Sequence, residues 1–230
     1  MKTLFETAKQ TDSFKTHNDF IKTLLNNDSE DYYQLHLDFI ANTESGIFHD
    51  RLCRGFAKRS QNAAKFLLIQ ANSGNLPNTV LADVIHILGL MKNDDLLQYI
   101  PNFLSSKDEN VRYQCIIVLG WLGNKNEIDV LLSILKSAEI HLLRGHCATA
   151  MRQIWFNHPD LSPDIIKYLA EHLKIESEDL VCAMMIITLQ DILNYKFGLK
   201  ENAQGEILGN IKTAKQKLNR YIEKYKGKPK

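Results

Sequence analysis

A twelve-residue pattern recurs along the chain at the spacing of a small helical hairpin. Three copies align without gaps and start at Val80, Val111 and Leu143, which are 31 and 32 residues apart. A fourth copy starts at Val181, and a fainter copy starts at Phe48, 32 residues before Val80. A constant period of about 20 to 50 residues is the signature of a repeat architecture. This spacing therefore constrains the fold more than any other feature.

Each copy carries the apolar pattern of an amphipathic helix. Apolar residues recur at positions 0, +4 and +8, counted from the first residue of the copy, and at +11 in every copy but the faint one, and this spacing forms one stripe on an α-helix. Further amphipathic segments lie between the copies, over 61–73, 94–105, 126–137 and 163–174. Their expected N-caps are Asp94, Asn126 and Ser162. Two helices in about 31 residues cannot bury an apolar face alone. The sequence therefore predicts an all-α solenoid of about five to six stacked helical hairpins.

One unit carries a set of family motifs: Leu96–Leu104 with Pro101 inside it, then Asp108, Val111-Arg112 and Leu119–Gly123. These motifs resemble a HEAT repeat, in which a proline kinks the first helix and a Val-Arg pair opens the second. The resemblance extends over 61–193. It implies a right-handed α-α superhelix in which the second helix of each hairpin lines the concave surface.

The chain is predicted to form a single domain, 1–230, with three parts. Residues 1–45 are expected to be N-terminal capping helices, and residues 46–195 form the HEAT-like repeats. Residues 200–230 are predicted to be a C-terminal amphipathic basic helix and tail. From Lys212 to the end there are eight basic residues and one acid, which leaves 20 basic and 26 acidic residues before that point. This mildly acidic body is a poor match to a polyanion, because affinity for nucleic acid rests on phosphate neutralisation.

Cysteine usage and hydropathy indicate the compartment. The four cysteines show no CxxC spacing, which favours reduced thiols and a cytoplasmic location. The N-terminus turns polar at once, unlike a signal peptide, and no apolar run approaches the roughly 18 residues of a membrane span. No membrane partner is expected.

Helix geometry predicts which residues of the second helices face a partner. At about 100° per residue, positions +3, +6 and +10 point away from the core stripe, and Tyr113 and Arg152 flank the same strip. We call this strip the second-helix face. Its residues are Arg51, Arg54, Lys58, Asp83, His86, Leu90, Tyr113, Gln114, Ile117, Trp121, His146, Thr149, Arg152, Gln153, Met184, Ile187 and Asp191.

The second-helix face has the composition of a protein-binding surface. A basic trio stands at one end, apolar and aromatic residues follow, and Asp191 stands at the far end. Grouped Trp, Tyr, Met and Ile are typical of interface hot spots. The alternative is that Ile117, Trp121 and Ile187 pack against an adjacent helix. The basic trio would grip an acidic partner or a phosphate, or be ordinary surface charge.

Motifs of enzyme chemistry are not found. None of the eight histidines forms an HExxH motif, and Cys147, beside His146, occupies a core position where a buried small hydrophobe is expected. No glycine-rich phosphate loop or GxSxG motif occurs. The sequence therefore predicts no catalytic residue, no metal ligands and no cofactor.

The leading functional hypothesis is a non-enzymatic protein-binding module of adaptor, inhibitor or immunity type. It would dock another protein, with an acidic patch, on the concave face; a regulatory subunit fits equally well. The alternative is a DNA-binding protein or an alkylation-repair DNA glycosylase of HEAT-like fold, with Trp121 and either Asp83 or Asp191 at its site. The face carries few cations beyond its first repeat, so nucleic acid is the less expected partner.

Overall fold

The computed structural model describes residues 1–226, with side chains through residue 224, and it is α-helical apart from loops and one short β-hairpin. The all-α repeat fold predicted from the sequence is confirmed. The chain divides into two compact units, Met1–Cys115 and Ile116–Lys230, whose boundary lies within helix α8 (Glu109–Leu122). The predicted tail residues 227–230 lie outside the described residues.

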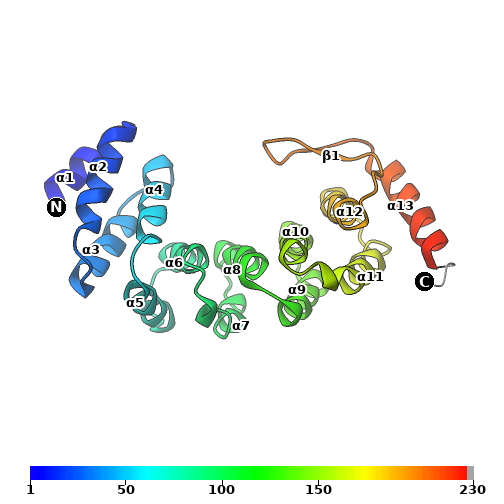
Figure 1. The fold of residues 1–230 in the computed structure, drawn as a ribbon, viewed down its shortest axis with the longest axis horizontal. Coiled ribbons are helices and arrows are strands. Elements are labelled where there is room, and N and C mark those ends of the chain that lie inside the picture. The colour runs from blue at the N-terminus through cyan, green and yellow to red at the C-terminus, as the bar shows by residue number, and fades with distance from the viewer. Residues whose placement is uncertain (227–230) are drawn as a thin grey trace. The chain divides into compact units, whose positions relative to one another are not determined.

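The first unit is a series of short helices that pack in pairs (Figure 1). In chain order they are α1 (Lys2–Lys9), α2 (Phe14–Leu25), α3 (Glu30–Ala41), α4 (Ile47–Phe56), α5 (Gln61–Asn72), α6 (Asn78–Leu90), the 3₁₀ turn η1 (Asp94–Leu96) and α7 (Ile100–Leu104). Helix α3 packs on α4, α5 packs on α6, and α4 contacts α6 directly. The second helices of successive hairpins therefore stack on one another.

The N-terminal helices cap this stack with an aromatic cluster. The rings of Phe5 and Phe39 stack with centroids 4.2 Å apart, and Phe20 and Phe48 contact the same group. All four side chains are buried. Because Phe48 is the first residue of the faintest copy, the cluster joins residues 1–45 to the repeats.

A buried arginine takes the place of an apolar residue at position +11 of that copy. Arg59 donates hydrogen bonds to the carbonyls of Leu24 and Asn27, near the end of α2, and to Nδ1 of His36. Burial and the neighbouring guanidinium lower the pKa of His36 to about 3, so the imidazole is neutral. The guanidinium thus satisfies carbonyls that a helix end leaves without partners.

The second unit contains longer helices and the hairpin (Figure 1). Its elements after α8 are α9 (Lys125–Ser137), α10 (His141–Asn157), the 3₁₀ turn η2 (Pro159–Leu161), α11 (Ser162–His172), α12 (Asp179–Leu193), β1 (Lys200–Glu201), β2 (Ile207–Leu208) and α13 (Ile211–Lys226). Helix α10 packs against both α9 and α12, and α13 packs on α12. The antiparallel strands pair Lys200 with Leu208 and Glu201 with Ile207.

The predicted core stripe is buried in every copy. Residues at positions 0, +4 and +8 of the five copies are 8% exposed or less. Position +11 is less regular: it is buried at Ile154 but only half-buried at Met91, Leu122 and Ile192. The repeat phase predicted from the sequence is therefore correct for positions 0, +4 and +8.

Helix starts differ from the sequence expectation at three places. The helix expected over 94–105 is split into η1 and α7, because Pro101 supplies no N–H and so favours a helix start. Asn124, not Asn126, caps α9 and forms a capping box with Glu127. Helix α11 begins at Ser162 itself.

The predicted basic helix over 200–230 is wrong for its first eleven residues, which contain the hairpin. The Asn202 side chain accepts hydrogen bonds from the backbone N–H groups of Gln204 and Glu206, which favours a turn over a helix. Gly205 and Gly209 have φ values of +81° and +127°, outside the helical region. The helix begins only at α13.

Candidate partner-binding surface

In the first unit, many polar residues of the second-helix face contact the neighbouring helix. Three pairs join successive helices, and these are Arg51 with His17 (α4 to α2), Asp83 with His49 (α6 to α4) and Gln114 with His86 (α8 to α6). Their donor–acceptor distances are 2.7, 3.0 and 3.0 Å respectively. These side chains were expected to face a binding partner. Instead, the three pairs connect successive helices, and we call them the polar ladder.

The three residues of the basic trio differ in their environment, because only one of them belongs to the polar ladder. Arg51 is held by His17 and lies over the ring of Phe14 at 4.7 Å, whereas Arg54 and Lys58 are exposed. Arg54 lies in the last turn of α4, where a cation complements the helix dipole. Two cations of the trio thus project into solvent. Leu90 is also exposed, and Tyr113 is half-buried.

In the second unit, the predicted residues converge on a pocket of about 190 Å³ between α10, α12 and the hairpin. Five residues of the second-helix face line it, and they are His146, Thr149 and Arg152 from α10 and Met184 and Ile187 from α12. Burial lowers the pKa of His146, so its imidazole favours the neutral form.

Several lining residues were not predicted from the sequence, namely Leu142, Leu180, Glu201, Gly205 and Ile207. The two leucines precede the first residues of their copies, and this position −1 points about 260° round the helix, between +6 and +10. The angular argument would have found them if it had been extended by one residue. The hairpin residues carry no repeat signal.

Several members of the strip in this unit are more enclosed than expected. Ile187 is only 6% exposed, so it forms part of the pocket wall rather than an outward contact, as the packing alternative anticipated. Ile117 and Trp121 are half-buried. The Gln153 Oε1 atom is buried without a hydrogen-bond partner among the described residues.

Arg152 ties the hairpin to this surface. Its Nη1 donates to Oδ2 of Asp191 at 3.2 Å and to Oε2 of Glu201 at 3.0 Å. The two acids are 43% and 36% exposed, whereas the arginine is 16% exposed. One half-buried guanidinium therefore connects α10, α12 and β1.

We expect Arg152→Ala to loosen the hairpin without unfolding the unit. Exposed ion pairs contribute less than about 1 kcal/mol, so the global unfolding midpoint should change little. The amides of 200–208 should exchange with deuterium several-fold faster, which hydrogen-exchange mass spectrometry measures peptide by peptide. Lys196→Ala, an exposed change just before the hairpin, is the control and should leave exchange unchanged. Unaltered exchange in the Arg152 variant would show that the salt bridges do not hold the hairpin.

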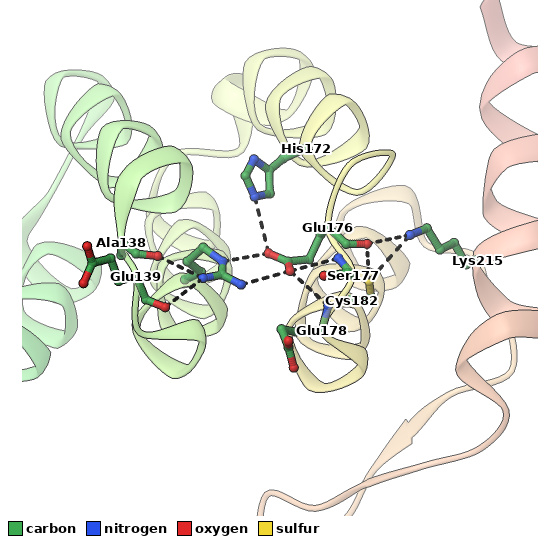
Figure 2. A network of polar contacts seen from close by, with 9 residues as sticks. Ala138, Glu139, His172, Glu176, Ser177, Glu178, Cys182 and Lys215 are labelled. Carbon is green, nitrogen blue, oxygen red and sulfur yellow. Dashed lines mark hydrogen bonds and ion pairs between the residues drawn. The ribbon is translucent and has the colours of Figure 1, made fainter.

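A second polar centre surrounds the buried carboxylate of Glu176 (Figure 2). Arg144 donates to it through Nε at 2.8 Å and Nη2 at 3.0 Å, and the backbone N–H groups of Ser177 and Glu178 each donate at 3.0 Å. His172 Nε2 lies 3.5 Å away. The Arg144 guanidinium is the main cause that holds the pKa of Glu176 at about 2.

This centre also involves the copy in which the sequence departs from the HEAT pattern. Arg144 retains the arginine of the Val-Arg pair, but Cys182 replaces it in the next copy. There Lys215 of α13 approaches instead, with its Nζ 3.0 Å from the Glu176 carbonyl oxygen and 3.7 Å from the Cys182 sulfur (Figure 2). The described partners of Glu176 are groups of this chain, so we interpret the centre as a structural contact between repeats and not as a binding site. The basic face of α13 is therefore not wholly solvated.

The fold and these surfaces define a helical-repeat protein, and comparison with known families identifies the repeat. The family model for HEAT repeats matches residues 65–152. This stretch consists of HEAT repeats, as its motifs indicated. No curated protein matches the chain. Among the described residues, no helix is long and apolar enough to cross a membrane.

Proposed function

We propose that the chain is a non-enzymatic protein-binding module, of adaptor, inhibitor or immunity type, which docks a segment of another protein on its second-helix face. HEAT repeats are commonly protein-interaction modules. The observation that carries the proposal is the pocket in the second unit, where residues of α10 and α12 from two successive repeats meet the hairpin.

The pocket has the size of an anchor site for one side chain. Its volume of about 190 Å³ lies below the roughly 300–1,000 Å³ of sites that enclose small-molecule ligands. Leu142 and Leu180 line it with 38% and 45% of their surface exposed, so they offer apolar area that a partner can cover. An apolar or aromatic side chain of a partner fits this arrangement, because such anchors dominate interface energies.

The partner also carries acidic groups in this proposal. The support comes from Arg54 and Lys58 of the first unit, which are four residues apart and exposed. Neither side chain belongs to the three pairs of the polar ladder that occupies Arg51. Exposed cations of this kind act mainly on association rate and salt dependence.

The test uses a random peptide library displayed on phage, selected against the purified full chain. Selected peptides are synthesised, and their Kd values are measured by fluorescence anisotropy. Leu180→Glu places a charge at the pocket while an acid remains favourable in the first turn of α12. We expect it to weaken binding by about tenfold or more, because an unpaired charge would face the apolar anchor. Leu208→Glu is the matched control, an exposed leucine that does not line the pocket, and it should bind like wild type.

Two outcomes would count against the proposal. One is a selection that yields no binding peptide, and the other is equal affinity for wild type and the Leu180 variant. Charge reversal of Arg54 and Lys58 together should reduce affinity for acidic peptides and flatten its salt dependence.

The enzyme alternative is tested with the same protein. Its proposed acids are both engaged, Asp83 with His49 and Asp191 with Arg152. Incubation with alkylated duplex DNA should therefore release no base. Base release that is lost on changing Asp83 or Asp191 to asparagine would establish the glycosylase instead.

A further inference from the structure

Three different metal-binding side chains meet between α4 and α6 of the first unit. His49 and Cys53 are one turn apart on α4, and Asp83 reaches them from α6. One donor atom from each residue lies within 4.8 Å of the others. His49 Nε2 is 3.0 Å from Asp83 Oδ2, and His49 Nδ1 is 3.9 Å from Cys53 Sγ. Among the residues whose side chains the structure describes, no other group of this kind comes as close.

The donor set matches a zinc-class ion. Thiolate, imidazole and carboxylate are the three side-chain donors that zinc binds, with bonds of about 2.0 to 2.3 Å, so neighbouring donors in a tetrahedral site lie roughly 3.5 Å apart. The two short distances involve different ring nitrogens of His49, and only one of them can bind a given ion. With one donor atom from each residue, the separations are at most 4.8 Å, so closing the site requires side-chain rotations that shorten the longest of them.

The surroundings favour a cation over a free thiolate nucleophile. The negative charges of Asp83 and Asp50 act on Cys53, which favours a cation at this position. A bound divalent ion would displace the thiol proton and bind the sulfur as the thiolate.

Access to the cluster is partial, which suits a site with one open position. The His49 and Asp83 side chains are 12% and 25% exposed, whereas Cys53 is buried at 5%. Ion entry therefore occurs from the side of Asp83, and a water molecule can complete four-fold coordination. The nearby Arg51 is held by His17 rather than by the cluster.

We infer that His49, Cys53 and Asp83 form a three-ligand site for a divalent ion of the zinc class. The ion would replace the His49–Asp83 ladder pair with a metal link between two stacked repeats. This inference concerns the first unit and is independent of the binding pocket proposed above.

Cobalt(II) titration of the reduced, untagged full chain tests the inference. Wild type should bind one equivalent and show a sulfur-to-cobalt charge-transfer band together with the visible bands of tetrahedral cobalt, and zinc should abolish both. Cys53→Ala should lose the charge-transfer band. Cys115→Ala is the matched control, because Cys115 is a buried cysteine of a neighbouring repeat outside the cluster, and it should titrate like wild type.

Asp83→Asn is the second variant, since it changes charge at a partly exposed position while keeping side-chain volume. It should weaken cobalt binding by about tenfold or more, because one anionic ligand is lost. Circular dichroism of each variant establishes that the helices are intact. Absence of the charge-transfer band in wild type, or its persistence in folded Cys53→Ala, would overturn the inference.

Discussion

Replacing Glu176 with glutamine is expected to lower the free energy of unfolding of the second unit by about 3 kcal/mol. Both carboxylate oxygens accept hydrogen bonds, Oε2 from Arg144 and Oε1 from Arg144 and two backbone N–H groups. In either orientation, the amide of glutamine would place its NH₂ group against a donor. The change also leaves the guanidinium, 16% exposed, without its counter-charge.

Denaturant unfolding monitored by tryptophan fluorescence measures this effect. Both tryptophans of the chain, Trp121 and Trp155, lie in the second unit, so the signal reports on that unit. Glu178→Gln is the matched control: this neighbouring glutamate is exposed, and only its backbone N–H enters the network. It should change stability by less than about 0.5 kcal/mol. Equal midpoints for the two variants would mean that the buried ion pair does not stabilise the unit.

The same carboxylate gives the wild-type protein a defined acid sensitivity. Its folded pKa of about 2 lies below its ordinary value of 4.5, so its contribution is fully present above pH 4.5 and is lost as pH falls toward 2. A shift of this size corresponds to about 3 kcal/mol, in accord with the cost expected for the glutamine variant. The stability difference between wild type and Glu176→Gln should therefore shrink as pH is lowered through this window.

The repeat and its core were predictable because they depend on local spacing. Positions 0, +4 and +8 lie on one helix, and the burial of Val111, Cys115 and Leu119 follows from that helix having to stack on others. The same angular argument placed His146 and Met184 on one surface, and the structure brings both to one pocket.

The polar pairs between helices could not be predicted in this way. They depend on which side chains of different helices come into contact, and a single sequence does not show this. His49 and Asp83 are 34 residues apart, and nothing in their local patterns shows that they form a pair. The strip was expected to face a partner, but Arg51, Asp83 and Gln114 contact side chains of neighbouring helices. The hairpin was missed for a different reason: the basic helix that follows Lys212 was extended back to residue 200, although Asn202, Gly205 and Gly209 favour a turn.

Gly120→Val is expected to destabilise the second unit by about 3 kcal/mol, at the upper end of the usual cost of overpacking. A Cβ atom at Gly120 would lie 3.0 Å from the Cα atom of Ala150 and 2.7 Å from Oε1 of Gln153. The glutamine can rotate away, but the Ala150 contact is with the backbone of α10. Because valine adds two further methyl groups, α8 must separate from α10, and buried contacts along both helices are lost. Unfolding monitored by tryptophan fluorescence measures the cost.

Gly120→Ala and Ala150→Gly separate the steric cause from helix propensity. Alanine gains up to about 1 kcal/mol of helix propensity over glycine, which offsets part of its clash, so Gly120→Ala should cost less than Gly120→Val. Ala150→Gly alone should destabilise by about 1 kcal/mol for the same reason. It also removes the Ala150 Cβ, 3.2 Å from the added atom, so the double variant with Gly120→Val should be more stable than the two single costs predict. Strict additivity would show that the two helices do not meet at this glycine. A double variant that is more stable than additivity predicts would show that α8 and α10 approach closely here because Gly120 has no side chain.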